Sequence, residues 1–411
     1  MNGAYRQTKM RDWLECYRVA CPICNKSGGC IINRNGDTVA CLRVESDVIF
    51  SKSPLQWIHR LTTKKEVKSD TKYHESHKKN PDSILDSVYS CMVNILELKS
   101  EHVDELMGSS RQLTGEQITS RQYRSFPEKP WEVAKTIMEY TRYQTFKGFP
   151  GFYQSKYGWT FSKNDGLMIP YRNEHNLIVG FQTRIDNPRN YVEVDNNSVK
   201  GFQTKIVQQP NTVECYMDDN LIWNGQMELK ESKRFSFDGQ DVTITLKKGN
   251  RYFWFSSANK PDGTSAGSPS PVHVAIPSEK LIHWNPGSLY KTDVVWVTEG
   301  ALKADIAADH ITKVYDEEEL KEKGDTVLAV PGVNTWSTVM PVLKNMEVKT
   351  VNLAFDMDST TNEQVRFQLK EFIEALKKDG YKINMVLWNK EDGKGIDDCF
   401  INRRYPVLRP L

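Results

Sequence analysis

Four of the eight cysteines of this chain have the spacing of a metal site: Cys21, Cys24, Cys30 and Cys41. The first two form a Cys-Pro-Ile-Cys knuckle, in which one tight turn can present two thiolates to the same ion. The other two flank the turn signal Asn35-Gly36-Asp37, which predicts a hairpin that brings them together. Four thiolates suit a tetrahedral, structural Zn²⁺ site. Two alternatives stay open: Cys16 could replace Cys30 as a ligand, or the cysteines could be free in a small core.

Three acidic residues directly follow apolar runs in the last third of the chain: Glu299, Asp356 and Asp358. The runs predict parallel strands, and functional groups in such sheets collect at the carboxyl ends of the strands. Side chains alternate along an extended segment, so the two aspartates should face the same side. A divalent cation such as Mg²⁺ or Mn²⁺ would relieve the repulsion among these carboxylates and polarise phosphate oxygens. Any one of them alone could instead be a turn residue or a helix cap.

Strand and helix patterns alternate from residue 291 onward, which favours an α/β fold with a parallel sheet covered by helices on both faces. The expected strands are 293–300, 325–333, 350–358 and 382–389, and the expected helices are 301–311, 336–344 and 361–380. This order would bring the acidic residues to one edge of the sheet.

Upstream of this unit the sequence divides into segments of different character. Residues 1–61 form a compact module around the cysteines, and 62–82 is a polar, Lys-rich linker that we expect to be flexible. Its lysines could contact phosphates or simply be a solvated tether. Residues 83–290 begin with helical periodicity and change to short strands, with a β-rich insert at about 190–250.

Composition limits the possible functions. Hydrophobic residues make up 38% and charged residues 26%, which is typical of a globular protein, and the net charge of +2 excludes a uniformly basic nucleic-acid binder. The sequence has no apolar segment long enough to cross a membrane and no apolar signal segment near its start, so we expect a cytoplasmic protein. The 43 aromatic residues, 10 Trp, 17 Tyr and 16 Phe, could form the core or stack on single-stranded bases.

The segments VVWVTEG, AVPGV and LAFDMD resemble the Toprim domain of bacterial replicative primases, topoisomerases and OLD-family nucleases. This resemblance implies that Glu299, Asp356 and Asp358 are the ligands of a catalytic Mg²⁺ or Mn²⁺ ion. It also implies that Gly300 and Gly332 form the tight turns after the first two strands of the domain.

Two further positions follow from the same resemblance. The segment GKGIDD is similar to the acidic turn after the next strand in primases, which implies that Asp397 is an auxiliary acid and Asp398 a weaker candidate. Replicative primases carry an aspartate four residues after the first glutamate, where this chain has Lys303. This lysine removes one metal-binding acid, or it neutralises phosphate. Asp305 is nearby, but two helical residues rotate it by about 200°.

The resemblance to bacterial-type primases extends upstream through GLMIPYRNEHNLIVGFQTRI, QWIHRL and YRSFP, and so covers most of the chain. It implies that Arg172, Arg184, Arg251 and Tyr252 contact nucleotide or DNA, because a planar guanidinium can bind phosphate through two hydrogen bonds. The zinc ligands depart from the three Cys and one His of cellular primases. The sequence also lacks a GxxxxGK[ST] phosphate loop, so ATP-driven unwinding is not expected.

The sequence therefore predicts an α/β protein with an N-terminal zinc ribbon, a helical connector, a mixed α+β primase-like subdomain with a β-rich insert, and a C-terminal Toprim domain at 291–411. The implied function is primer synthesis on single-stranded DNA from NTPs during replication of a phage or mobile element, with a separate helicase or polymerase as partner. Two alternatives remain, a Toprim-type metal-dependent nuclease and a catalytically inactive DNA-binding replication protein.

Overall fold

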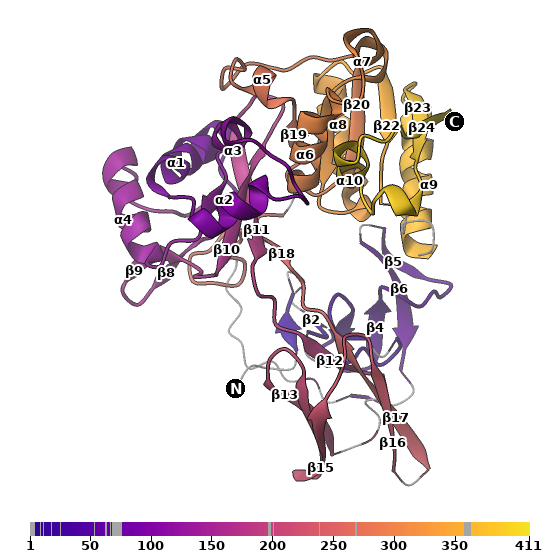
Figure 1. Cartoon of the computed structure of the whole chain (residues 1–411). Helices are drawn as coiled ribbons and strands as arrows, with labels where there is room; N and C mark the ends of the chain where they lie inside the picture. The colour runs from indigo at the N-terminus through magenta and orange to yellow at the C-terminus, as the bar shows by residue number, and fades with distance from the viewer. Residues whose placement is uncertain are drawn as a thin grey trace. The chain divides into compact units, whose positions relative to one another are not determined.

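The computed structural model of the chain describes most residues and divides them into two compact units (Figure 1). The described residues are 5–8, 10, 12–17, 19–24, 26–52, 54–61, 64, 65, 67, 76–195, 199, 201–237, 239–267, 269–356 and 363–411. The first unit combines Met1–Tyr73 with Asn187–Arg251, and the second combines His74–Asp186 with Tyr252–Leu411. Much of the linker predicted at 62–82 lies outside the described residues, as does Asp358.

The N-terminal part of the first unit is a six-stranded antiparallel sheet in the order β1-β2-β3-β4-β6-β5. Its strands are β1 Arg6–Gln7, β2 Trp13–Glu15, β3 Ile31–Asn33, β4 Thr38–Cys41, β5 Ile49–Lys52 and β6 Leu55–Arg60. The hairpin expected around Gly36 is confirmed, because β3 pairs with β4 and the Gly36 N–H donates to the Asn33 carbonyl (2.9 Å). This hairpin brings the end of β4 beside the start of β3.

The remainder of the first unit consists of two three-stranded antiparallel sheets, in the orders β12-β17-β16 and β13-β14-β15. The strands are β12 Tyr191–Val194, β13 Phe202–Gln208, β14 Thr212–Met217, β15 Asn220–Gln226, β16 Ser232–Phe237 and β17 Gln240–Lys247. They occupy the stretch for which the sequence predicts a β-rich insert. Within this unit, Lys26 forms an ion pair with Glu193 of β12 (2.9 Å), which links the insert to the N-terminal segment.

Helices begin the second unit, as their sequence periodicity predicts: α1 Asp82–Ile95, α2 Ser100–Met107, α3 Gly115–Arg121 and α4 Pro130–Thr141. Helix α1 buries residues spaced by three and four, including Leu85, Val88 and Met92. Thr114 caps α3 in a capping box with Gln117. Helix α2 begins at Ser100 and has no side-chain cap hydrogen bond.

An antiparallel sheet in the order β18-β11-β10-β7 packs against these helices. The strands are β7 Arg124–Ser125, β10 Gly166–Arg172, β11 Ile178–Ile185 and β18 Tyr252–Trp254, and a separate hairpin is formed by β8 Phe152–Ser155 and β9 Gly158–Phe161. Almost every residue of β10 and β11 is buried. A strand buried on both faces lies inside the fold, which is consistent with the apolar runs that predicted it.

The C-terminal sheet has the order β19-β21-β20-β22-β23-β24. Its strands are β19 His273–Ala275, β20 Val294–Glu299, β21 Thr326–Val330, β22 Thr350–Leu353, β23 Lys382–Leu387 and β24 Val407–Pro410. The four central strands are parallel, as expected from the sequence. The antiparallel edge strands β19 and β24 were not expected, because a three-residue strand and a largely exposed one leave weak patterns.

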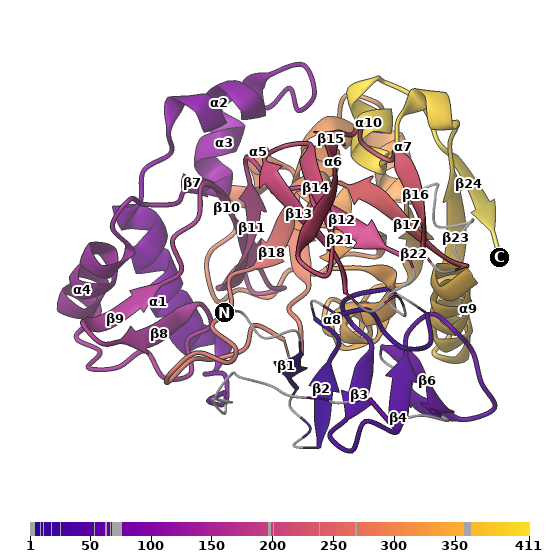
Figure 2. The same ribbon diagram turned by 90° about the horizontal axis from the view of Figure 1, so that it is seen from below.

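Helices cover both faces of this sheet (Figure 2). The elements are α5 Ser278–Leu281, α6 Ala301–Ile311, α7 Glu317–Lys323, η1 Val333–Thr338, α8 Val339–Asn345, α9 Glu363–Lys378, η3 Lys390–Asp392 and α10 Ile396–Ile401. Trp296 of β20 packs with α6 and α10, whereas its neighbours Val295 and Val297 pack with α8 and α9. Because side chains alternate along β20, its residues contribute to two separate hydrophobic cores, one on each face of the sheet.

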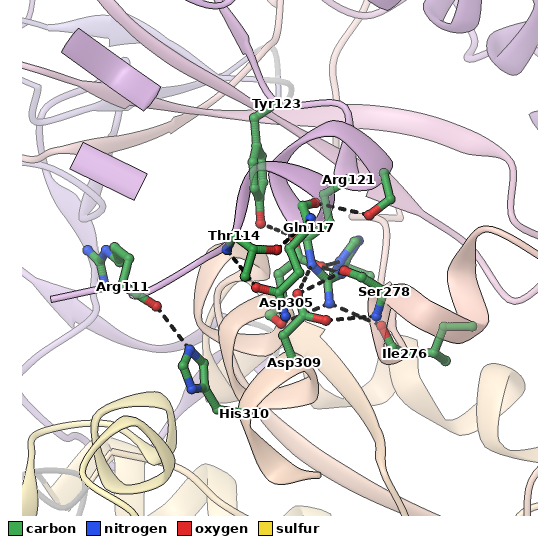
Figure 3. Close-up of polar contacts among 12 residues, drawn as sticks. Arg111, Thr114, Gln117, Arg121, Tyr123, Ile276, Ser278, Asp305, Asp309 and His310 are labelled. Carbon is green, nitrogen blue, oxygen red and sulfur yellow. Dashed lines mark hydrogen bonds and ion pairs between the residues drawn. The ribbon is translucent and has the colours of Figure 1, made fainter. Parts of the chain in front are cut away.

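A buried ionic network fastens α6 to α3 within the second unit (Figure 3). Arg121, only 3% exposed, donates from Nε to Asp309 Oδ2 (2.7 Å) and forms an ion pair with Asp305. Its Nη2 donates to the carbonyls of Asp305 (2.9 Å) and Ile276 (3.0 Å). Although burial lowers the pKa of Arg121, the two carboxylates raise it above its usual value, so the guanidinium stays charged.

The carboxylates of the network have further partners. Tyr123 donates to Asp305 Oδ2 (2.8 Å), and His273 Nε2 lies 3.0 Å from Asp305 Oδ1. The Ser278 N–H donates to Asp309 Oδ1 (2.7 Å). Burial raises the pKa of Asp305, but Arg121 and His273 outweigh it and lower that pKa overall. Since each charge is matched, removal of one partner would leave another buried and unpaired.

We therefore expect Arg121→Met to lower the free energy of unfolding by about 3–5 kcal/mol, because Asp305 and Asp309 would lose their counter-ion. Urea denaturation followed by circular dichroism measures this change. Arg366→Met is the matched control, since Arg366 is an exposed residue of α9 and its loss should change stability by less than about 0.5 kcal/mol. Equal stability of the two variants would contradict the role of the network.

Candidate active site

The acidic residues Glu299 and Asp356 come to the same edge of the C-terminal sheet. Strands β20 and β22 are parallel neighbours with Val297 opposite Leu353, so both acids follow the carboxyl ends of paired strands. Glu299 is half-buried, and its Oε1 accepts a hydrogen bond from the Val333 N–H (3.0 Å) at the start of η1. Such an edge is where parallel sheets place functional groups.

A left-handed turn at Gly300 separates Glu299 from α6. The φ of Gly300 is +82°, which L residues with a side chain rarely adopt. The turn lets the chain pass from the end of β20 directly into α6, which begins at Ala301 and carries Lys303 in its first turn. The turn at Gly300 therefore sets the positions of Glu299 at the end of β20 and Lys303 on α6 relative to each other.

Asp356 is 7% exposed and is held by an ammonium group from α6. Lys303 Nζ donates to both carboxylate oxygens, with 2.6 Å to Oδ2. A second ammonium, that of Lys394, lies 3.6 Å from the same oxygen. The structure thus places Lys303 where the resemblance to primases puts an acid, and uses it to balance the charge of Asp356.

Asp397 is the most deeply buried acid of the region, with 1% exposure. Burial, together with the nearby charge of Asp398, raises its pKa to about 6, although Lys303 and Arg111 act in the opposite direction. Arg111 Nη1 lies 3.6 Å from Oδ2, whereas Oδ1 has no hydrogen-bond partner within the described structure. A Cβ at Gly395 would lie 2.3 Å from that Oδ1, so a side chain at this position would force the Asp397 carboxylate to move.

Two other acids near the site have structural roles in the described structure. Asp398 Oδ2 accepts hydrogen bonds from the N–H groups of Lys394 (3.0 Å) and Gly395 (3.2 Å), and so closes the turn before α10. Asp305 points into the Arg121 network, as its rotation on the helix relative to Lys303 predicts. Among the described residues, neither carboxylate forms an ion pair with the ammonium of Lys303, which pairs with Asp356.

A divalent cation fits the donor types of this edge. Carboxylate oxygens are the ligands that Mg²⁺ and Mn²⁺ prefer, and Glu299, Asp356 and Asp397 supply them from three elements. Within the part of the chain that the structure describes, however, these acids do not form a ready group of three ligand atoms. Asp358, the fourth expected acid, lies outside the described residues.

Four basic or aromatic residues are predicted to contact nucleotide or DNA: Arg172, Arg184, Arg251 and Tyr252. Arg172 is buried, its Nη1 donates to Asn176 (3.0 Å), and burial lowers its pKa to about 10. Arg184 is buried as well and donates to Glu105 (2.7 Å). Arg251 is half-buried, and Tyr252 is exposed on β18. Contact of these residues with phosphate stays a prediction.

The predicted four-cysteine set is assembled in the first unit: the Sγ atoms of Cys21, Cys24, Cys30 and Cys41 all lie within 4.8 Å of one another. The Sγ of Cys30 is 3.6 Å from that of Cys24 and 3.8 Å from that of Cys41. A tetrahedral ion with bonds of about 2.3 Å to sulfur requires sulfurs about 3.8 Å apart. The cluster therefore has the dimensions of a zinc site.

Hydrogen-bond donors face these sulfurs, and the sulfur positions show which cysteines form the cluster. The N–H groups of Leu42 and Arg43 donate to Cys30 and Cys41, each at 3.3 Å, and Arg43 Nη1 lies 3.5 Å from Cys30 Sγ. Such donors stabilise thiolates. Cys16 is buried outside the cluster, where burial raises its pKa to about 12. The structure thus selects Cys30 over Cys16.

Three basic residues near these sites escaped sequence reasoning. Lys394 belongs to the GKGIDD segment and could have been noticed there, since it directly precedes the acidic turn. Arg43 closely follows Cys41, and a basic residue beside a metal knuckle is a weak signal. Arg111 lies far from Asp397 in the sequence, and no sequence pattern indicates that they are partners. Only the packing of the second unit brings them together.

Comparison with known proteins gives the following likenesses. A family described as "Domain of unknown function (DUF3854)" matches residues 291–405, and no curated protein matches the chain. Among solved structures, the DnaG primase catalytic domain bound to ssDNA has a TM-score of 0.43 at 10% identity over 80% of each chain. A DNA primase domain from Pseudomonas aeruginosa has 0.43 at 12% over 79% of each chain. The Aquifex aeolicus primase (zinc binding and RNA polymerase domains) has 0.40 at 11%, over 98% of this chain and 81% of that one.

The raised pKa of Asp397 predicts a pH-dependent stability. Because the pKa is about 6 in the folded chain and lower in the unfolded chain, the native state binds more protons between about pH 4 and pH 6. The contribution of Asp397 to the free energy of unfolding should therefore fall as pH rises through this window. Asp397→Asn should lack this pH dependence. At pH 7.5 its free energy of unfolding should exceed that of the wild type by on the order of 3 kcal/mol.

Urea denaturation at pH 4.5 and pH 7.5, in buffer without divalent cations, measures this difference. Asp293→Asn is the matched control, because Asp293 precedes β20 at the opposite end of the sheet and its side chain is 66% exposed. A variant of Asp397 that kept the pH dependence of the wild type would contradict the assignment.

Proposed function

We propose that this protein is a primase-like nucleotidyltransferase that extends primers on a single-stranded DNA template. The observation that carries the proposal is the position of Glu299 and Asp356 after two paired parallel strands, in segments that resemble the Toprim domain. The substrates would be NTPs and template, in replication of a phage or mobile element beside a separate helicase or polymerase. The proposal includes Asp358 as the third acid by resemblance alone.

A divalent cation held by Glu299, Asp356 and Asp358 would supply positive charge to the triphosphate. The chain's own residues then do the positioning. Val333 orients the Glu299 carboxylate through its backbone N–H, and Asp356 holds the ammonium of Lys303 at the same edge. Lys303 and Lys394 are the cations available to receive phosphate oxygens once the metal takes over Asp356. Positioning and electrostatics of this kind account for most phosphoryl-transfer catalysis.

Zinc is the ion that we propose for the four-cysteine cluster. The sulfur spacing and the absence of an open coordination position both favour a structural role, with folding of the N-terminal sheet as its result. Through this module the chain would hold or select the template. Arg43, beside the sulfurs, adds positive charge on that surface.

A second candidate function follows from Lys303. Its ammonium already neutralises Asp356, which is the arrangement expected if the site binds DNA without turning over. A third possibility is strand cleavage, because the same acids serve Toprim nucleases. Labelled single strands incubated with and without NTPs and Mn²⁺ separate the three: primer extension requires NTPs, cleavage does not, and an inactive site shows neither.

We expect Asp356→Asn to abolish NTP-dependent primer synthesis, because removal of this carboxylate charge weakens cation binding and frees Lys303 from its partner. Extension of labelled products on single-stranded templates in Mg²⁺ or Mn²⁺ measures the effect, with a loss of at least about 100-fold. Asp293→Asn, just before β20 at the other end of the sheet, should retain full activity. Wild-type synthesis by the Asp356 variant would refute the proposed site.

The zinc assignment predicts that purified protein carries about one zinc ion per chain, measured by mass spectrometry of the metal. Cys30→Ser should lose the ion and destabilise the N-terminal sheet, because three thiolates leave the tetrahedron open. Cys16→Ser and Cys215→Ser should retain it, since both cysteines are buried outside the cluster. Zinc loss in Cys16→Ser with retention in Cys30→Ser would reverse the ligand assignment.

A further inference from the structure

A groove lined mainly by aromatic side chains lies between α4 and the β8–β9 hairpin of the second unit. Its volume is about 460 Å³, and its lining includes Trp131 of α4, Tyr153 of β8, Tyr157 of the turn, Phe161 of β9, and Lys163. In both ribbon views the hairpin lies beside α4 (Figures 1 and 2), and the two elements are in contact. None of these elements contributes to the acidic site or to the cysteine cluster.

The aromatic rings of this groove are exposed to a degree that core packing does not require. Trp131 is 54% exposed and Tyr157 is 86% exposed, whereas Phe161 forms the buried floor. Large exposed aromatics gathered around one hollow mark a binding surface more often than isolated ones do. Exposed flat rings are suited to stacking with other flat groups.

Lysines surround the rings. Lys156 Nζ lies 4.6 Å from the centre of the Tyr157 ring, and Lys260 Nζ lies 5.3 Å from that of Tyr153. Across the described ranges of the chain, Lys156, Lys163 and Lys260 form no ion pair with a carboxylate. Their positive charge is therefore available to a ligand.

Three carboxylates close in sequence to the groove residues are paired with other lysines. On α4, Glu132 pairs with Lys129 (2.9 Å) and Glu139 with Lys135 (3.9 Å). Beside Lys260, Asp262 pairs with Lys147 (3.0 Å). No acidic residue is among those that line the groove, which leaves a basic and aromatic surface.

We propose that this groove binds single-stranded DNA, with bases stacked on Trp131 and Tyr157 and phosphates close to Lys156, Lys163 and Lys260. Aromatic platforms combined with a basic rim are the usual means of binding single strands without sequence preference. A proline-rich peptide could also lie on aromatic rings, but it would make no use of the unpaired lysines. The choice of DNA rests on the proposed function, in which the chain handles a single-stranded template.

The groove would give the chain a second contact with the DNA strand, separate from the acidic site. Two weak contacts on one chain bind a continuous strand more tightly than either does alone. The groove would thus hold template that is outside the acidic site while Glu299 and Asp356 serve the chemistry.

Fluorescence anisotropy of a labelled oligothymidine with the full-length chain, without NTPs or added Mg²⁺, tests the proposal. The double variant W131A/Y157A should bind at least about 10-fold more weakly, because two stacked bases lose their platforms. The double variant K156Q/K260Q should make the dependence of log affinity on log salt less steep by about 1.4, because two phosphates lose their partners. Tyr140→Ala is the matched control, since Tyr140 is 75% exposed on α4 but does not line the groove.

Unchanged affinity in W131A/Y157A, or an unchanged salt dependence in K156Q/K260Q, would overturn the proposal. Tight binding of a proline-rich peptide that displaces the oligonucleotide from these rings would also overturn it. Melting temperatures equal to that of the wild type exclude misfolding as the cause of any loss. The oligonucleotide assay contains no NTPs, so it reports strand binding whether or not the wild-type chain synthesises primers. Failure of primer synthesis with intact groove binding would therefore count against the proposed function and not against the groove.

Discussion

The buried charge of Arg121 is the constraint on which the arrangement of the second unit depends. A guanidinium removed from water is costly unless every donor is matched, and here the match comes from two aspartates one turn apart on α6. Because Asp305 and Asp309 lie on the same helix face, Arg121 can satisfy both only if α3 and α6 keep one mutual position. The interaction therefore specifies geometry at least as much as it contributes stability.

Helix α6 transmits this constraint to the acidic site. One face carries the aspartates, a second packs Ala304, Ala307 and Ala308 against the sheet, and Lys303 leaves from its first turn toward Asp356. Since a helix is rigid over three turns, anchoring of one face places the others. The Arg121 network does not contact Asp356 directly. It nevertheless helps to determine the position of Lys303, the ammonium partner of Asp356.

Charge balance is a common feature of both candidate metal sites. At the sheet edge, lysines from α6 and from the loop before α10 balance Asp356, and Arg111 lies beside the buried Asp397. At the cysteine cluster, Arg43 and backbone N–H groups face the sulfurs. Clustered acids or thiolates repel one another, so a fold that holds them needs positive partners before any ion binds. A metal at the acidic edge consequently competes with an internal ammonium.

The sequence by itself determined what local patterns encode: the hairpin at Gly36, the four-cysteine spacing and the alternation of parallel strands and helices from residue 291. These signals act between residues a few positions apart, through turn geometry and side-chain periodicity. Only the tertiary structure decided that Arg121 is a buried ion partner, that Lys303 binds Asp356 and that Arg111 meets Asp397. A charged residue has the same identity at the surface and in the core, and its partner is chosen by contacts between segments distant in the chain.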